Sequence, residues 1–161
     1  MQLIKDQQII DNEWQHADEV NVLPAGKVTV PLSRWQAERE ALISRGDIGL
    51  RLTATDALDA IKDDLQHFEI IAIEFEQFND GRGFSLAYLL RERYGYQGEI
   101  RAIGTILRDQ LYYLQRCGIN AVELAEGQNL QEALRAFDEF TVRAQPDVLH
   151  EKETVQAGPW R

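Results

Sequence analysis

Ile70-Ile71-Ala72-Ile73 is the most apolar run of the chain, and it leads through Glu74 into Asp80-Gly81-Arg82-Gly83 and then into a helical pattern. A near-continuous apolar run is typical of a strand that is buried on both faces, as in a parallel sheet. In α/β proteins, ligands bind where such a strand ends in a loop that turns into a helix. This stretch therefore predicts both the fold class and the place of a site.

The same strand-then-helix unit is expected five times. Strands are predicted over residues 28–30, 48–52, 69–74, 99–104 and 121–124, and helices over 33–44, 55–65, 83–94, 106–117 and 129–142. Repeated units of this kind predict right-handed βαβ connections and a mostly parallel sheet. Five units are too few to close a (β/α)₈ barrel. The sheet is therefore either open and doubly wound, or a partial TIM-barrel-like arrangement whose edge is covered by a second copy or by the N-terminal arm.

The chain of 161 residues suits one compact domain. We expect a single α/β domain over residues 1–142, which begins with a short N-terminal arm at 1–22. Residues 9–14 of this arm are expected to form one side of a small hairpin. The helical pattern fails after residue 142, so 143–161 are predicted to form a flexible tail.

Composition narrows the classes of partner. The formal net charge is −10, which disfavours nucleic-acid binding because that binding needs a basic surface to replace counterions. The chain has no run of about 20 apolar residues that would predict a membrane span. Cys117 is the only cysteine, which fits a reducing cytoplasm, and its place on an apolar helix stripe favours core packing over redox chemistry. A homodimer is compatible with all of these features.

The Asp80–Ser85 loop is the first candidate site, for a small anion. Gly81 and Gly83 would let a ligand approach the backbone, the next helix would point its N-terminus at the same place, and Arg82 would offer a planar donor fork. The competing interpretation is a tight loop in which Asp80 caps the helix or pairs with Arg82. The predicted ligand-binding residues are Asp80, Gly81, Arg82, Gly83, Ser85, Arg101 and Arg108, and the catalytic candidates are Asp80, Arg82 and Asp109.

Other polar residues follow the predicted strands at the same end of the sheet: Thr53, Asp56, Glu74, Thr105 and Glu123. No nicotinamide, flavin or hydrolase fingerprint accompanies them, so no cofactor is predicted. The three histidines, at positions 16, 67 and 150, are scattered without a second ligand at metal spacing, so no metal site is predicted either.

The chain resembles the bacterial family DUF934 over roughly residues 20–125. The resemblance is carried by Leu23-Pro24, Val30-Pro31-Leu32-Ser33-Arg34-Trp35, Phe78 with Asp80-Gly81-Arg82-Gly83-Phe84-Ser85, Ala87, Leu90-Arg91, Arg93, Gly95-Tyr96, Gly98-Glu99, Arg101-Ala102, Gly104, Asp109-Gln110-Leu111 and Arg116-Cys117-Gly118. The family often has an acidic residue after the glycine that matches Gly104. This chain has Thr105 there.

The resemblance implies a role in assimilatory sulfite reduction, because members are labelled probable oxidoreductases of that process and accompany the sulfite reductase hemoprotein. Two hypotheses follow. In one, the protein is an accessory that binds the hemoprotein or a sulfur oxyanion. In the other, it is an enzyme on a barrel-like scaffold that acts on a small anionic substrate, with Asp80, Arg82, Glu74, Arg101 or Asp109 in the reaction. A structural role for the loop, without catalysis, is the third interpretation.

Overall fold

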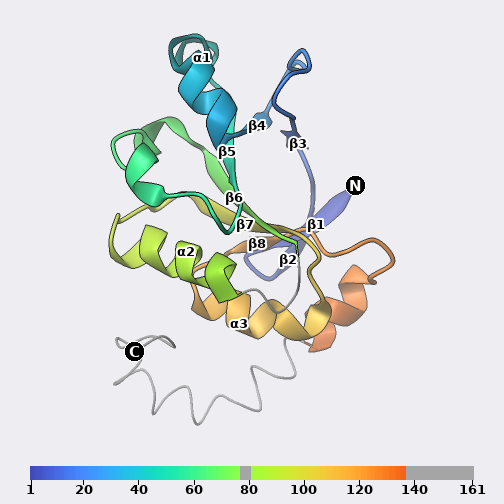
Figure 1. Cartoon of the computed structure of the whole chain (residues 1–161). Helices are drawn as coiled ribbons and strands as arrows, with labels where there is room; N and C mark the ends of the chain where they lie inside the picture. The colour runs from blue at the N-terminus through green and yellow to red at the C-terminus, as the bar shows by residue number, and fades with distance from the viewer. Residues whose placement is uncertain (77–80, 137–161) are drawn as a thin grey trace.

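A computed structural model describes residues 1–76 and 81–136, which form one eight-stranded sheet with helices between the strands (Figure 1). The spatial order of the strands is β2-β1-β8-β7-β6-β5-β4-β3. The strands are β1 (Gln2–Lys5), β2 (Gln8–Asp11), β3 (Gln15–His16), β4 (Val28–Pro31), β5 (Ile48–Leu52), β6 (Ile70–Phe75), β7 (Glu99–Gly104) and β8 (Ala121–Val122). The α-helices are α1 (Leu32–Arg45), α2 (Gly81–Glu92) and α3 (Leu111–Arg116), and residues 130–136 are also helical.

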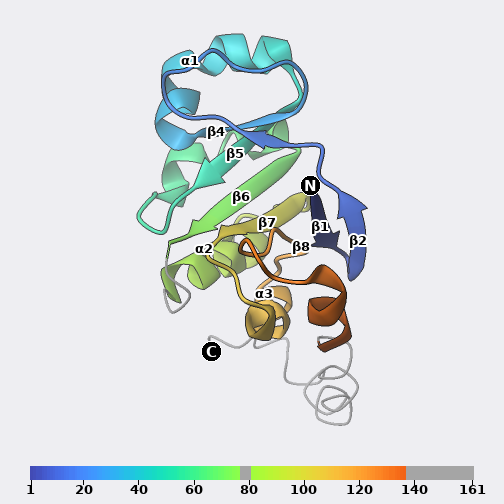
Figure 2. The same cartoon turned by 90° about the vertical axis from the view of Figure 1, so that its right-hand side faces the viewer.

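The strands from β3 to β8 are all parallel to one another, and the sheet curls into half of a barrel (Figure 2). The predicted α/β class with a mostly parallel sheet is therefore confirmed, and of its two shapes the partial barrel is the one observed. The predicted strands at 48–52 and 99–104 have the bounds of β5 and β7.

The N-terminal arm covers both edges of this half-barrel. The β1–β2 hairpin joins β8 in antiparallel pairing, while β3 extends β4 in parallel at the opposite edge. The expected hairpin is thus present, with a two-residue turn at Asp6 and Gln7, whose φ values of 49° and 65° match the mirror-image turns of hairpins. The segment between β2 and β3 has to cross the open side of the barrel to connect the two edges.

Side-chain alternation gives the sheet two different faces. Val28, Val30, Leu50, Leu52 and Ile73 point outward into one apolar cluster. This cluster also contains Trp35 of α1 and Leu86, Ala87 and Leu90 of α2. The helices therefore cover the outer face, and the residues between these positions face the inside of the half-barrel.

Two expected helices differ from the structure. Residues 55–65 form two short 3₁₀ turns, Leu58–Ile61 and Leu65–His67, and the helix expected over 106–117 is a 3₁₀ turn at Arg108–Gln110 followed by α3. In both cases Leu58, Ile61, Leu111 and Leu114 are still buried, because the apolar spacing fits either kind of turn. Only the first half of the helix expected over 129–142 is described, and the predicted tail at 143–161 lies outside the described residues.

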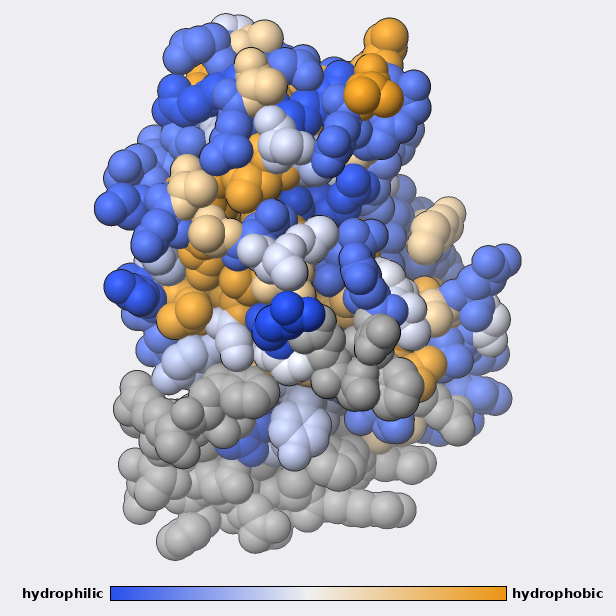
Figure 3. Space-filling model, viewed as in Figure 1, coloured by the Kyte–Doolittle hydropathy of each residue, from blue (hydrophilic) through white to orange (hydrophobic). Residues whose placement is uncertain are grey.

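The described surface is mainly hydrophilic on the face seen in Figure 3, with hydrophobic surface at the tip of the segment between β3 and β4. Val20 and Val22 in this segment are 84% and 94% exposed. In the two described ranges, no helix is both long enough and apolar enough to cross a membrane.

Candidate functional site

Charged side chains gather on the inner face of the half-barrel. Strand register places Arg51, Ala72, Arg101 and Ala121 in one row across β5, β6, β7 and β8, with large and small side chains alternating. Glu74 lies one step further toward the carboxyl ends of the strands, on the same face. Ala72 separates the two arginines, and the inner face is polar where the outer face is apolar.

Arg101 is the centre of a buried ion network. Its side chain is 2% exposed, and its Nε donates to Glu99 Oε2 at 2.7 Å. Its Nη1 donates to Glu123 Oε2 at 2.9 Å and to Asn12 Oδ1 at 2.8 Å. Lys5 Nζ lies 3.0 Å from the other oxygen of Glu99. The network therefore joins β7 to residues of the N-terminal arm, and each buried charge has a partner of opposite sign.

His16 connects the two ends of the curled sheet. Its Nε2–H donates to Glu123 Oε2 at 2.9 Å, although His16 is on β3 and Glu123 follows β8. Its Nδ1 shares a hydrogen bond of 2.7 Å with Thr29 Oγ1. A hydroxyl, an imidazole and a carboxylate in this order resemble a nucleophile triad. Thr29 is 0% exposed, however, so its hydroxyl has no access to a substrate and the arrangement serves to close the half-barrel.

Glu123 is held in its charged form by these contacts. Burial by itself would raise the pKa of this carboxyl, but the hydrogen bonds and positive charges of His16 and Arg101 outweigh burial and lower the pKa below its ordinary value. Glu123 therefore carries a negative charge between two cationic or donor groups at neutral pH, and it stabilises the arm rather than supplying a free acid.

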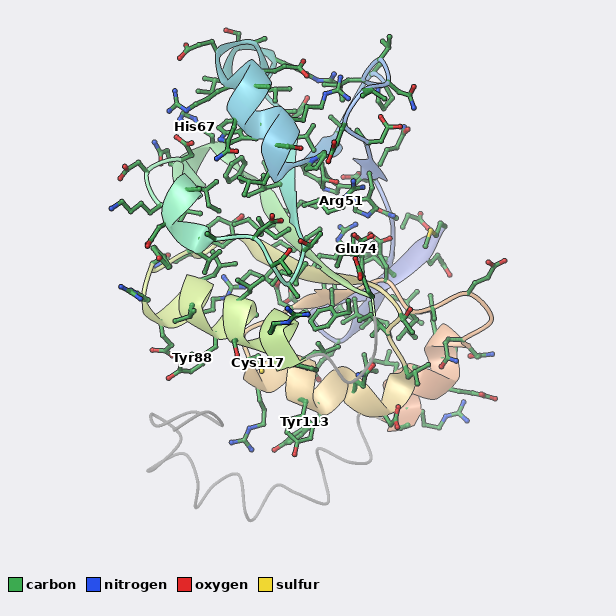
Figure 4. The ribbon with its side chains drawn as sticks, in the orientation of Figure 1. Arg51, His67, Glu74, Tyr88, Tyr113 and Cys117 are labelled. Atoms are coloured by element: carbon green, nitrogen blue, oxygen red, sulfur yellow. The ribbon has the colours of Figure 1, made fainter. Side chains whose placement is uncertain are left out.

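Arg51 and Glu74 differ from the rest of the inner face. Both are half-buried, and within residues 1–76 and 81–136 neither side chain makes a hydrogen bond or an ion pair. They come from the neighbouring strands β5 and β6 and lie beside each other in the middle of the molecule (Figure 4). A guanidinium and a carboxylate near the carboxyl ends of parallel strands, with their polar groups unused, are placed to contact a ligand.

The arm also closes the amino end of the inner face. Trp14 is 7% exposed, and Lys27 Nζ lies 5.7 Å from the centroid of its ring. A polar cavity of about 200 Å³ lies beneath this part of the arm, lined in part by Ile70 and Glu99. Its lysines already pair with carboxylates, Lys27 with Glu13 at 3.3 Å and Lys5 with Glu99. The carboxyl end of the inner face is consequently the better candidate for a site.

The residues predicted for the anion loop have a different local structure. Asp80 lies outside the described residues, and Gly81–Ser85 form the first turn and a half of α2. Gly83 is buried against Phe75, where a Cβ would come within 2.4 Å of the ring. Arg82 is exposed, and Ser85 Oγ donates to the carbonyl of Gly81. Gly83 and Ser85 thus have packing and helix contacts in addition to the ligand role that was predicted for them.

Of the other predicted site residues, Asp109 and Arg101 lie in different surroundings, and the side chain of Arg108 lies outside the described part of the structure. Asp109 is exposed in the 3₁₀ turn that also contains Arg108. Arg101 belongs to the buried network, and Cys117 is 2% exposed in the core, as its apolar stripe indicated. In the described part of the chain, no group of three or more His, Cys, Asp or Glu side chains could hold a metal ion.

Arg51, His16 and Asn12 were not among the residues predicted for a site. Arg51 had a signal, because it is the one charged residue inside the apolar strand Ile48–Leu52 and alternation places it opposite Leu50 and Leu52. His16 and Asn12 had none, because their partners are 107 and 89 residues away in sequence. Only the path of the arm across the barrel brings them together.

Comparison with known proteins identifies the family. The family model described as "Bacterial protein of unknown function (DUF934)" matches residues 49–155, which is more than half of the chain. No curated protein and no solved structure matches the chain. The matched range includes Arg51, Glu74, Arg101 and Glu123. The chain belongs to the DUF934 family.

Proposed function

We propose that the protein binds a small oxyanion at Arg51 on the inner face of the half-barrel and serves as an accessory protein of sulfite reduction. The observation that carries the anion site is the half-buried guanidinium of Arg51, which has no partner within the described residues. Arginine presents a planar fork of donors that matches the oxygens of carboxylate, phosphate or sulfur oxyanions.

The surroundings of Arg51 favour such a ligand. A charge that is partly removed from water is stabilised by a partner of opposite sign, and the inner-face cations Arg101 and Lys5 already have carboxylate partners. The arm closes the amino end, so a ligand reaches Arg51 from the carboxyl end of the strands, where barrel proteins place their sites. An anion there would give Arg51 the partner of opposite sign that Arg101 and Lys5 already have.

The sulfur chemistry comes from the family resemblance, since members carry the label of probable oxidoreductases of sulfite reduction and accompany its hemoprotein. The proposed partner is therefore the sulfite reductase hemoprotein. The formal net charge of −10 would favour encounter with a basic surface on that partner.

Growth of a deletion strain tests this proposal. Without the gene, we expect failure on sulfate and sulfite and normal growth on sulfide or cysteine. Wild type should restore growth, and Arg51→Gln should not. Arg135→Gln is the matched control, because Arg135 is an exposed arginine on the helix at 130–136. Arg51→Gln should leave the free energy of unfolding within about 0.5 kcal/mol of wild type, since no described side-chain hydrogen bond or ion pair is lost.

Two results would count against the proposal. Normal growth of the deletion strain on all four sulfur sources, with no second copy of the gene, would remove the link to sulfite reduction. Full complementation by Arg51→Gln would remove Arg51 from the site and leave the Asp80–Ser85 region as the next candidate, to be tested with Arg82→Ala in the same strain.

An enzymatic role is the second candidate, and the observation in its favour is Glu74. A carboxylate beside an anion-binding arginine could move a proton on the bound substrate. Catalysis by Glu74 would make Glu74→Gln as defective as Arg51→Gln on sulfite, whereas an accessory role leaves Glu74→Gln able to support growth on sulfite.

A further inference from the structure

Glu74 imposes a chemical condition on any anion that binds Arg51. An ionised carboxylate only accepts hydrogen bonds, whereas a guanidinium only donates them. Arg51 and Glu74 lie on the same face of adjacent strands, and Glu74 is one step beyond Ala72, the register partner of Arg51. No described residue donates to the side chain of Glu74, so a ligand that binds Arg51 meets an unpaired carboxylate.

We propose that Glu74 selects oxyanions that carry a proton, such as hydrogensulfite or hydrogen phosphate, and rejects sulfate. This inference rests on the proposed binding of an oxyanion by Arg51. A proton-bearing oxyanion accepts hydrogen bonds from Arg51 through its charged oxygens and donates its own proton to Glu74. Sulfate is fully deprotonated at neutral pH, so it has no hydrogen to donate and brings its negative charge against the carboxylate.

The discrimination comes from repulsion as much as from attraction. A site that contains an unpaired acceptor rejects a ligand that lacks the matching donor, because the buried polar group then stays unsatisfied. Two negative groups in contact add a like-charge penalty, which specific sites use against the wrong ligand. Glu74 is half-buried on the inner face, so water screens this penalty less than it would at the open surface.

For a protein that acts in sulfite reduction this selectivity has a use. Sulfate and sulfite are both small oxyanions of sulfur, and Arg51 alone would bind either of them. Sulfite takes up a proton near neutral pH, whereas sulfate does not. A single carboxylate at the position of Glu74 is therefore sufficient to separate the two by hydrogen bonding.

Isothermal titration of the full chain at pH 7 with sulfite, phosphate and sulfate tests the inference. Wild type should bind sulfite or phosphate at least about tenfold more tightly than sulfate. Glu74→Gln should bring the three affinities to within about threefold, mainly by gaining sulfate affinity, because the neutral amide can donate as well as accept. Glu92→Gln, an exposed glutamate at the end of α2, is the matched control and should keep the wild-type ratio.

The outcomes separate the inference from the proposed function. Two results would overturn the role of Glu74. One is equal affinity of wild type for sulfate and sulfite, and the other is a Glu74→Gln protein in which the ratio of these two affinities is the same as in wild type. If wild type binds no anion, or if Arg51→Gln binds anions as wild type does, the proposed function fails and the inference fails with it. If Arg51→Gln does not fold, Arg51→Lys, which retains the positive charge, replaces it in this binding test. Tighter binding of phosphate than of sulfite would support selection by Glu74 and count against the sulfur assignment.

Discussion

Along β5, Leu50 and Leu52 point toward the helices, whereas Arg51 between them points into the half-barrel. The same contrast runs through β7, where Ile100 and Ala102 belong to the apolar cluster and Arg101 to the ion network. The outer face is stabilised by removal of apolar surface from water, at roughly 25 cal/mol per Å². The inner face is stabilised only while its charges remain paired.

The two faces therefore respond differently to substitution. An outer-face residue contributes by shape and volume, and its replacement costs stability through cavities or overlaps. An inner-face residue of the network contributes by balancing the charges of its neighbours. Its removal therefore leaves those buried charges without a partner. Arg51 and Glu74 form a third class, because they are on the inner face and outside the network.

The largest effect is expected for Arg101→Met. The variant keeps much of the volume but leaves Glu99 and Glu123 buried without their arginine, which typically costs about 3–5 kcal/mol. Urea unfolding followed by circular dichroism measures this loss. Arg135→Met is the control and should change stability by no more than about 0.5 kcal/mol. A loss below about 1 kcal/mol for Arg101→Met would mean that Lys5 and His16 are sufficient to hold the two carboxylates.

On the outer face we expect an intermediate effect from Gly83→Ala. Alanine is the better helix former, but its Cβ would lie 2.4 Å from the Phe75 ring, which is 1% exposed and packs edge-on against Phe84 at 5.2 Å. We expect a loss of about 1–3 kcal/mol in the same unfolding experiment.

Gly81→Ala is the matched control in the same helix, because nothing lies within 4 Å of the place that an added Cβ would occupy. It should be neutral or slightly stabilising. Equal stability of the two alanine variants would show that Phe75 moves without cost and that Gly83 is not constrained by packing.

The smallest effect is the pH dependence that Glu123 contributes. Its pKa is lower in the folded chain, so its stabilisation is present above the ordinary carboxyl pKa of about 4 and is lost as the pH falls below it. The side chain of Glu123→Gln does not ionise, so this variant has no such contribution to lose when the pH falls. The gap in unfolding free energy between wild type and Glu123→Gln should therefore be narrower at pH 3 than at pH 7.

Unfolding curves for both proteins at the two pH values check this expectation, with Glu92→Gln, at an exposed glutamate of α2, as the control. A gap of the same size at both pH values would show that Glu123 does not gain stability from its charge, and that the link between β3 and the end of β8 depends on hydrogen bonding alone.

Much of the fold could be predicted because its signals are local. β7 was predicted with its bounds, since Glu99–Gly104 contains Ile100, Ala102 and Ile103 and lies between Gly98 and a turn, and α2 was predicted from its leucine stripe. The expected helix over 55–65 was wrong because the spacing of Leu58, Ile61 and Leu65 also suits 3₁₀ turns. Glu74 and Glu123 were expected at the carboxyl ends of strands, where the structure places them.

The candidate site could be predicted only in part. The glycines after β6 indicated a ligand. In the structure, the Phe75 ring leaves no room for a side chain at position 83, and no local sequence pattern shows this contact. Arg101 was predicted to bind a ligand, and its role in the ion network depends on Asn12 and Glu123, which are distant in sequence.

The amino-acid sequence by itself determined the order of strands and helices, the burial of their apolar stripes and the parallel sheet, because these follow from side-chain spacing along short segments. Only the tertiary structure decided that the sheet curls into a half-barrel closed by its own N-terminal arm, since closure depends on pairing between β1 and β8 and between β3 and β4. It also decided which inner-face charges are paired and which are not. Contacts over about a hundred residues of chain have no signature in the spacing of either partner. Glu74 was a candidate from its place at the end of a strand, whereas Arg51 became one only after the fold was known.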